Sequence, residues 1–285
     1  MDYFRTLIIL ICISILLTAC GRDENPINTP VSGNSAHSSS VRAQDILSKY
    51  YVIAHRGYWD SKNPQNSLAS LERALQLDIY GTEMDIRQTK DGYIVVNHDA
   101  EYNGLSVANS TYEVLSRQTL SNGEVLPLFE DFLKVKKNIG GSVKLIVELK
   151  ECNVVDIVTL IDTYGLQSEV EYISFSEKLC DQLVCLGYGY KTYYLGGNIS
   201  PADIKNRGYG GIDYNSSIYS SNSDWIKGAQ NLGLGTIVWT VDRTDVIKYY
   251  VQQGVLVTTN RPVEASAVCN SLKEKGTDIH QVTID

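Results

Sequence analysis

The sequence is poor in the residues that mark a metal–thiolate centre, a disulfide scaffold or a nucleic-acid surface. Its 285 residues include six cysteines, and 25 Lys and Arg are outnumbered by 33 Asp and Glu, which gives a net charge of −8. An acidic balance without a basic stripe argues against a nucleic-acid partner. The cysteines lack metal-site spacing and are too few for a disulfide framework in a chain of this length. The polar and charged side chains are therefore the main guide to function.

The sequence also lacks an apolar run long enough to cross a bilayer comfortably. The run from Leu7 to Leu17 follows Arg5 and suits the central region of a secretory signal. Its Leu17-Thr18-Ala19-Cys20 ending resembles a bacterial lipoprotein box. We therefore expect a signal peptide over 1–19, a lipidated Cys20, and an exported lipoprotein of the cell envelope, in the periplasm or on the outer-membrane surface. An ordinary cleaved signal with a chance cysteine is the alternative.

The next segment differs in composition from the rest of the chain. Residues 20–45 are rich in Ser, Asn and Pro and have almost no large apolar side chain. Such a composition predicts a flexible tether that joins the anchor to the folded part. No comparable linker follows, so residues 46–285 are predicted to form a single domain.

From residue 50 onward, short apolar runs alternate with helical patterns, as βα units around a parallel sheet do. Several of the helical patterns end in glycine, which is common at helix C-termini. Eight units of this size predict an α/β fold, a TIM (β/α)8 barrel, and an open doubly wound sheet is the main alternative. The predicted strands are 51–55, 81–87, 143–149, 171–175, 191–195, 211–214, 236–241 and 255–259.

One further strand cannot belong to the parallel set. The run that ends at His98 follows 81–87 too closely for a parallel crossover, which needs a dozen or more residues. Asp91-Gly92 between alternating apolar residues predicts a hairpin instead. If these two residues form the turn, Asp85 lies opposite His98 on the neighbouring strand. The barrel is thus expected to carry a β-hairpin arm after its second strand.

Acidic side chains gather at the predicted carboxyl ends of neighbouring strands. Glu83 and Asp85 are two residues apart on one strand and so share a face, and Glu148 ends the next barrel strand. Three carboxylates without thiolates describe a site for a hard cation, Mg²⁺ or Ca²⁺. Pairing of each acid with a local Lys or Arg is the simpler alternative.

The positions of the histidines support a catalytic site beside these acids. The chain has four histidines, and two of them, His55 and His98, sit at strand ends beside the acids. Imidazoles that flank a metal site suit a general acid and a general base. Arg56 and Lys150 add positive charge that would stabilise a phosphate rather than a neutral acyl or sugar group.

These residues belong to a series of short motifs that resembles the glycerophosphodiester phosphodiesterase family. The resemblance covers nearly all of 50–262, and its elements recur in order with suitable spacing. The motifs are His55-Arg56-Gly57, Pro64-Gln65-Asn66-Ser67, Glu83-Met84-Asp85, Thr89-Lys90-Asp91-Gly92, Val95-Val96-Asn97-His98-Asp99, Pro127-Leu128-Phe129-Glu130, Glu148-Leu149-Lys150 and Trp239-Thr240-Val241.

The resemblance implies a barrel that cleaves a small-molecule phosphodiester to an alcohol and a phosphomonoester. It implies acid/base roles for the two strand-end histidines, a divalent metal on the three acids, and phosphate contacts from the Arg and the Lys. Two positions depart from the usual family pattern: Gln65 stands where many members have Glu, and Asn260 where Asp is usual. Because of these two departures, the sequence does not identify the alcohol that the substrate carries.

The same residues are compatible with two other interpretations. A barrel glycosidase would use two of the carboxylates but leaves the histidines and cations without a role. A catalytically altered surface lipoprotein that only binds a phosphorylated or sugar ligand would be favoured by a missing metal ligand or histidine, and none is missing. Trp239 is expected in the substrate pocket, where its ring would stack on the leaving group. Packing in the core at the barrel end is an equally good explanation of its position.

Overall fold

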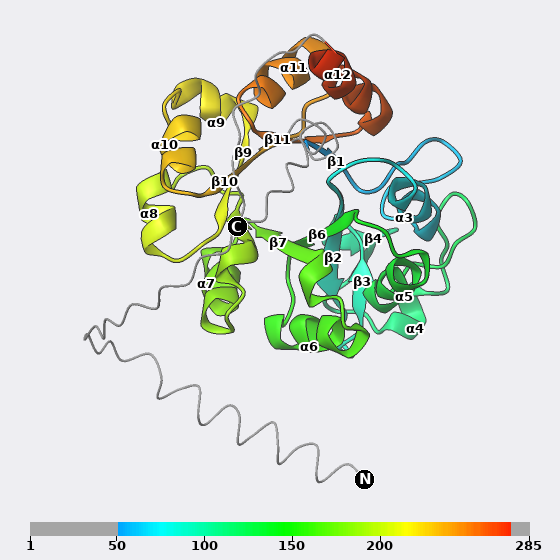
Figure 1. Cartoon of the computed structure of the whole chain (residues 1–285). Helices are drawn as coiled ribbons and strands as arrows, with labels where there is room; N and C mark the ends of the chain where they lie inside the picture. Colours follow the sequence, from blue (N-terminus) through cyan, green and yellow to red (C-terminus); the bar gives the residue numbers. More distant parts are fainter. Residues whose placement is uncertain (1–50, 275–285) are drawn as a thin grey trace, which may run out of the picture. The chain divides into compact units, whose positions relative to one another are not determined.

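The computed structural model describes residues 51–274, so the predicted signal peptide, Cys20 and the tether lie outside the described residues. Its parallel strands close into a ring, with helices on the outside (Figure 1). In pairing order they are β1 (Val52–Ala54), β2 (Gly81–Gln88), β6 (Lys144–Leu149), β7 (Val170–Ser174), β8 (Thr192–Tyr194), β9 (Gly211–Asn215), β10 (Gly235–Trp239) and β11 (Leu256–Thr259), which pairs again with β1. The predicted TIM barrel is confirmed, and all eight predicted strands are present.

The helices follow the strands around the ring and bury their apolar sides against them. Side-chain caps start several of them; for example, Ser67, Asn153 and Ser176 each accept a hydrogen bond from a backbone N–H in the first turn. None of the helices within 51–274 is long and apolar enough to cross a membrane. The helices are α3 (Leu68–Leu75), α4 (Tyr112–Leu115), α5 (Phe129–Ile139), α6 (Val154–Tyr164), α7 (Glu177–Cys185), α8 (Pro201–Asn206), α9 (Ser216–Ser221), α10 (Trp225–Asn231), α11 (Thr244–Gln252) and α12 (Pro262–Glu274).

The barrel core consists of strand residues that are buried on both sides. Ile53, Leu145, Val147 and Ile237 are each at most 1% exposed. β-Branched and leucine side chains of this kind fill the space inside the ring and between the ring and the helices. This closed ring gathers the carboxyl ends of all eight strands at one end of the molecule.

The hairpin arm is present, but its predicted register is wrong by one residue. β3 (Ile94–Val96) runs antiparallel to β2, and the N–H of Asn97 donates to the carbonyl of Asp85 at 2.9 Å. Asp85 therefore lies opposite Asn97 rather than His98. The turn spans residues 90–92, and Gly92 has a φ of +89°, as hairpin loops of three residues commonly require. The extra turn residue shifts every pairing by one position.

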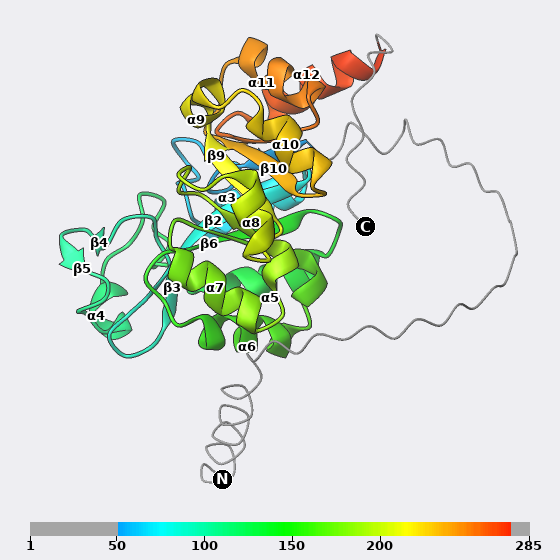
Figure 2. The same ribbon diagram turned by 90° about the vertical axis from the view of Figure 1, so that its left-hand side faces the viewer.

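The segment after the hairpin folds at the side of the barrel. β4 (Glu101–Tyr102) and β5 (Leu105–Ser106) form a small antiparallel pair, and Figure 2 shows them with α4 outside the ring of helices. Apolar side chains of this segment and one residue of β3 form a second hydrophobic cluster, which consists of Val95, Tyr102, Val107, Leu115 and Leu126. The Glu124 carboxylate accepts hydrogen bonds from the N–H groups of Leu68 and Ala69 in the first turn of α3. This segment is thus tied to the rim of the barrel.

Candidate active site

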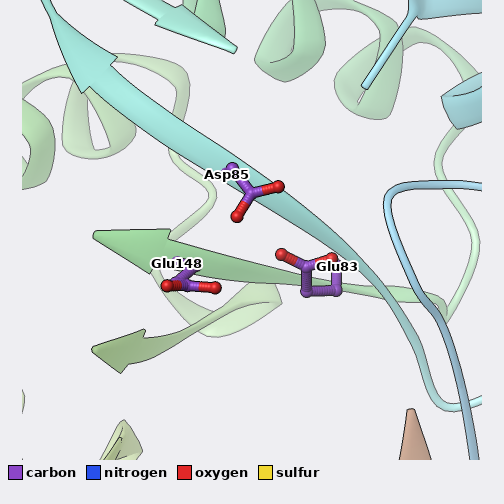
Figure 3. A group of neighbouring side chains, drawn as sticks. All are labelled: Glu83, Asp85 and Glu148. Atoms are coloured by element: carbon purple, nitrogen blue, oxygen red, sulfur yellow. The ribbon is translucent and has the colours of Figure 1, made fainter. Parts of the chain in front are cut away.

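Three acids meet inside the ring near the carboxyl ends of β2 and β6. The parallel register sets Asp85 beside Glu148, and Glu83 lies two residues earlier on the same face of β2. Each offers a carboxylate oxygen, and these oxygens lie within 4.8 Å of one another. Figure 3 shows the three side chains facing a common space between the two strands. All three are buried, at 3%, 1% and 8% exposed for Glu83, Asp85 and Glu148.

Burial of like charges shifts the pKa values of these acids. Burial, and then the negative charges of Asp85 and Glu148, raise the pKa of Glu83 well above its ordinary value. Burial and the charge of Asp85 raise the pKa of Glu148 to about 7. Burial alone would raise the pKa of Asp85, but the ammonium of Lys150, the amide of Asn66 and the guanidinium of Arg56 hold it below its ordinary value. A divalent cation would relieve this repulsion.

The triad also has the ligand atoms that a cation needs. Oε1 of Glu83 is buried and has no hydrogen-bond or ion-pair partner within the described part of the chain, whereas Oδ1 of Asp85 and Oε1 of Glu148 accept no other hydrogen bond and face the ammonium of Lys150. The Lys150 ammonium lies 3.1 Å from Oδ1 of Asp85 and also contacts Glu148, so a positive charge already stands beside two of the acids. An all-oxygen set of this kind fits Mg²⁺ or Ca²⁺. The three predicted metal ligands are thus brought together.

The loop after β1 brings Arg56 to the triad in an unusual backbone conformation. Arg56 and Gly57 have φ angles of +57° and +87°, and the first is rare for a residue with a side chain. The Arg56 N–H donates to Oε2 of Glu83 at 2.8 Å, and its Nε lies 3.3 Å from Oδ2 of Asp85. A Cβ at Gly57 would lie 2.4 Å from Oγ of Ser70, so both the left-handed φ and the close packing require glycine here.

Two residues of the Pro64–Ser67 motif support this arrangement. Gln65 accepts a hydrogen bond from Nη1 of Arg56 at 2.8 Å, so the loss of the usual Glu keeps a hydrogen bond and removes a negative charge. Asn66, with φ of +56°, donates from Nδ2 to Oδ2 of Asp85 at 2.8 Å. Asn66 therefore fixes the orientation of a predicted metal ligand, a role that the sequence did not reveal.

His55 lies between β2 and β11 at the edge of the triad. Its Nε2 lies 4.0 Å from Oε2 of Glu83, and its Nδ1 is 2.8 Å from Oδ1 of Asn260. Asn260 in turn donates from Nδ2 to Asp242 at 2.8 Å. Burial lowers the pKa of His55, and the hydrogen bond to Asn260 offsets this only in part. The ring is therefore neutral at neutral pH.

His98 lies on the solvent side of the same site. It follows Asn97, the residue paired with Asp85, and Arg87 donates from Nε and Nη2 to its carbonyl at 3.0 and 2.9 Å. Its Nδ1 lies 2.7 Å from a carboxylate oxygen of Asp99, and the side chain is 41% exposed. Since the carboxylate accepts the Nδ1 proton, Nε2 of His98 is left to contact a bound molecule.

Aromatic side chains form a wall beside Lys150. The Trp239 ring lies at the end of β10, and its Nε1 donates to the carbonyl of Asp213 at 3.0 Å, which fixes the ring. The Phe175 ring packs edge-on against the Trp239 ring, with 5.5 Å between the ring centroids, and Phe175 is 48% exposed. The Nζ atom of Lys150 lies 5.8 Å from the centroid of the Phe175 ring. Trp239 is thus a packed residue at the site rim, and Phe175 is the more exposed ring. No motif in the sequence marks Phe175 as a site residue.

A parallel barrel with a buried polar site at the carboxyl ends of its strands is the arrangement of a TIM-barrel enzyme. Residues 55–264 match the glycerophosphoryl diester phosphodiesterase family, and the chain belongs to this family. The expected resemblance and the expected enzyme class, a phosphodiesterase, are thereby confirmed.

Individual relatives agree with this assignment. A glycerophosphodiester phosphodiesterase of Caldanaerobacter subterraneus is 28% identical over 238 residues, which cover 73% of this chain and 92% of the relative. The crystal structure of a glycerophosphodiester phosphodiesterase from Parabacteroides distasonis is 35% identical, with a TM-score of 0.75 over 78% of this chain and 98% of the other. A phosphodiesterase of Oleispira antarctica, solved with the product sn-glycerol-3-phosphate, shares the fold at 19% identity and a TM-score of 0.66, over 77% and 96% of the two chains.

Proposed function

We propose that the chain hydrolyses a glycerophosphodiester-like phosphodiester to an alcohol and a phosphomonoester, with Mg²⁺ or Ca²⁺ held by Glu83, Asp85 and Glu148. The buried triad carries this proposal, because three carboxylates this close repel one another, Lys150 supplies one positive charge to two of them, and Oε1 of Glu83 has no partner within the described residues. Family membership supplies the class of reaction. The bound cation would neutralise negative charge on the phosphate oxygens.

Arg56 and Lys150 are assigned to the phosphate of the substrate. Both lie against Asp85, at 3.3 and 3.1 Å, and both side chains are largely buried. Fixed cations in a partly dry site stabilise the charge that develops on a phosphoryl group. Because Gln65 contributes no charge, Arg56 shares its guanidinium with one nearby carboxylate rather than two.

The two histidines are assigned to proton transfer. Neutral His55 takes the proton of the attacking hydroxyl, and His98 gives a proton to the oxygen of the leaving alcohol as its bond to phosphorus breaks. When the attacker is a neighbouring hydroxyl of the substrate, the product of this step is a cyclic phosphate. Water then opens the ring with the two roles exchanged, and a phosphomonoester remains. The lowered pKa of His55, caused by burial, and the position of its Nε2 at 4.0 Å from Glu83 support its assignment as the first base.

A head-group panel tests the proposal. The purified parent is incubated with glycerophosphodiesters that differ in their alcohol and with an artificial bis-aryl phosphodiester, and the products are identified by phosphorus NMR. We expect release of an alcohol and a phosphomonoester from at least one glycerophosphodiester. Binding of phosphorylated ligands without turnover across the panel would instead favour a ligand-binding lipoprotein.

The exposed ring of Phe175 is expected to contact the alcohol part of the substrate. Phe175→Ala should raise KM for phosphodiesters with a large or cationic alcohol about 3- to 10-fold, which is the worth of one aromatic contact, and leave small alcohols nearly unchanged. KM values across the panel measure this. Tyr190→Ala is the matched control, because Tyr190 is also exposed but precedes β8 at the opposite end of the barrel. An equal rise for every alcohol would contradict the assignment.

The raised pKa of Glu148 predicts how metal stabilisation depends on pH. In the metal-free protein this pKa is about 7 rather than 4.5, so the folded chain holds a proton that the unfolded chain releases. Protonation of Glu148 therefore adds to the free energy of unfolding. This contribution is complete below pH 4.5 and is lost as the pH rises to 7. It amounts to a few kcal/mol, at roughly 1.4 kcal/mol for each pH unit between the two pKa values. The cation binds the ionised carboxylate, so Mg²⁺ or Ca²⁺ should raise the melting temperature more at pH 7.5 than at pH 5. An equal or larger rise at pH 5 would count against the site.

We also propose that the protein is anchored in the cell envelope through lipidated Cys20. The Leu17-Thr18-Ala19-Cys20 ending and the polar segment after it support this. Cys20→Ala should move the protein from the membrane fraction to the soluble fraction and leave kcat on a soluble substrate unchanged. A parent protein that is already soluble after export would contradict the anchor.

A further inference from the structure

We propose that Asp242 is a positioning residue that acts through Asn260 to hold the proton of neutral His55 on Nδ1. This inference rests on the proposed role of His55 as a base, and it concerns two residues outside the triad. Asp242 follows β10, and Asn260 follows β11, so the loops after two neighbouring strands build a support behind the histidine. The support is a chain of two hydrogen bonds, each 2.8 Å long.

The direction of every hydrogen bond in this support is fixed. The Asp242 carboxylate only accepts: Oδ1 takes hydrogen bonds from the Thr259 hydroxyl at 2.9 Å and from the Asn260 N–H at 2.8 Å, and Oδ2 takes one from Nδ2 of Asn260. The Thr259 hydroxyl, in turn, accepts from the N–H of Arg261 at 3.0 Å, so its own proton points to Asp242. Asn260 is held at both its backbone and its side chain.

The consequence reaches the imidazole. Because Nδ2 of Asn260 is committed to Asp242, Oδ1 of Asn260 must face Nδ1 of His55, and an amide oxygen can only accept. The Nδ1 atom of His55 therefore carries the proton. The lone pair lies on Nε2, which is the atom 4.0 Å from Glu83 and directed toward the triad. A carboxylate that touches neither the triad nor the ring thus decides which ring nitrogen is the base.

Asp242→Asn should reverse this arrangement. The amide oxygen of the new side chain keeps the bonds from Thr259 and the Asn260 N–H, which places its NH₂ group against the NH₂ group of Asn260. The Asn260 amide then turns over, its NH₂ faces Nδ1 of His55, and the ring proton moves to Nε2. We expect kcat to fall at least about 100-fold, as for other histidine bases held in the wrong tautomer, with KM changed less than about threefold.

Exchanging the two residues should restore the tautomer. In Asp242→Asn combined with Asn260→Asp, the new amide donates to one oxygen of the new carboxylate, and the other oxygen accepts the Nδ1 proton of His55. We expect kcat within about tenfold of the parent, although the single change costs about 100-fold. Asp245→Asn is the matched control, because this carboxylate is exposed, lies three residues further on in the first turn of α11, and pairs with Arg243 at 2.7 Å. It should leave kcat unchanged.

Nitrogen NMR of the imidazole reads the tautomer without any turnover. In chelator-treated protein at pH 8, the His55 signals, assigned with His55→Ala, should show a protonated Nδ1 in the parent, a protonated Nε2 in Asp242→Asn, and a protonated Nδ1 again in the exchanged variant. An unchanged tautomer in Asp242→Asn, with or without a lower melting temperature, would overturn the proposal. So would an exchanged variant no better than the single one. A parent that hydrolyses no phosphodiester would refute the proposed function and leave this measurement interpretable.

Discussion

Replacing His55 by alanine is expected to lower kcat about 10³-fold or more on every phosphodiester substrate. His55 is neutral, its Nε2 faces the triad, and its Nδ1 is hydrogen-bonded to Asn260. Nε2 is therefore free to accept a proton. Loss of a general base costs roughly 10²- to 10⁴-fold. The loss should be as large for an activated aryl ester as for a glycerophosphodiester, since both need an activated attacker. Steady-state kinetics on the two substrates measures this.

His98→Ala provides the comparison that separates the two roles. His98 is assigned to the leaving alcohol, and an aryl leaving group needs no proton. The variant should therefore lose activity on a glycerophosphodiester and keep most of it on the aryl ester. If His98→Ala lost both activities equally and His55→Ala spared the aryl ester, the two roles would be exchanged.

Replacing Glu83 by glutamine is expected to weaken metal binding and the metal-dependent rate by more than 100-fold, because loss of a ligand costs more than the roughly 10- to 100-fold cost of losing an outer partner. The same change should leave the melting temperature of the metal-free protein unchanged or raised. Glu83 is a buried acid with repelling neighbours, so its neutral form is the easier one to bury. The amide oxygen can still accept the hydrogen bond from the Arg56 N–H.

Glu171→Gln is the matched control for this prediction. Glu171 is also a buried acid of the barrel, but it accepts a hydrogen bond from the Tyr80 hydroxyl and lies 3.5 Å from Nζ of Lys144. Its loss should lower the melting temperature and leave metal affinity nearly unchanged. Calorimetric titration with Mg²⁺ and Ca²⁺ and thermal unfolding of both variants give the comparison. Equal effects of the two substitutions on metal affinity would contradict the triad as the binding site.

The sequence predicted the fold well because its signals are local. Each barrel strand is a short apolar run and several helices end in glycine, and both features can be seen within a few positions. Short helices such as α8 leave a weaker signal, since Pro201–Asn206 has too few residues for a clear periodic pattern. The register error had a similar origin: a turn of two residues and a turn of three residues have the same Asp91-Gly92 signal.

The site was predicted in part, and the residues that were missed act over long sequence distances. Glu83, Asp85 and Glu148 could be placed together because strand ends of a barrel meet at one end. Asp242 lies 18 residues from Asn260 and acts on a ring 205 residues away from that amide, and no local pattern connects them. A departure from the family pattern at Asn260 was the one available signal. It indicated the position but not its partner.

Metal dependence of hydrolysis tests the central claim most directly. The full-length protein is treated with a chelator, dialysed, and assayed on the glycerophosphodiester it cleaves best, before and after Mg²⁺ or Ca²⁺ is added back. The account predicts that the treated protein is inactive and that one of the two cations restores the rate in the parent but not in Glu83→Gln. Hydrolysis that continues unchanged in the chelator-treated parent would contradict it.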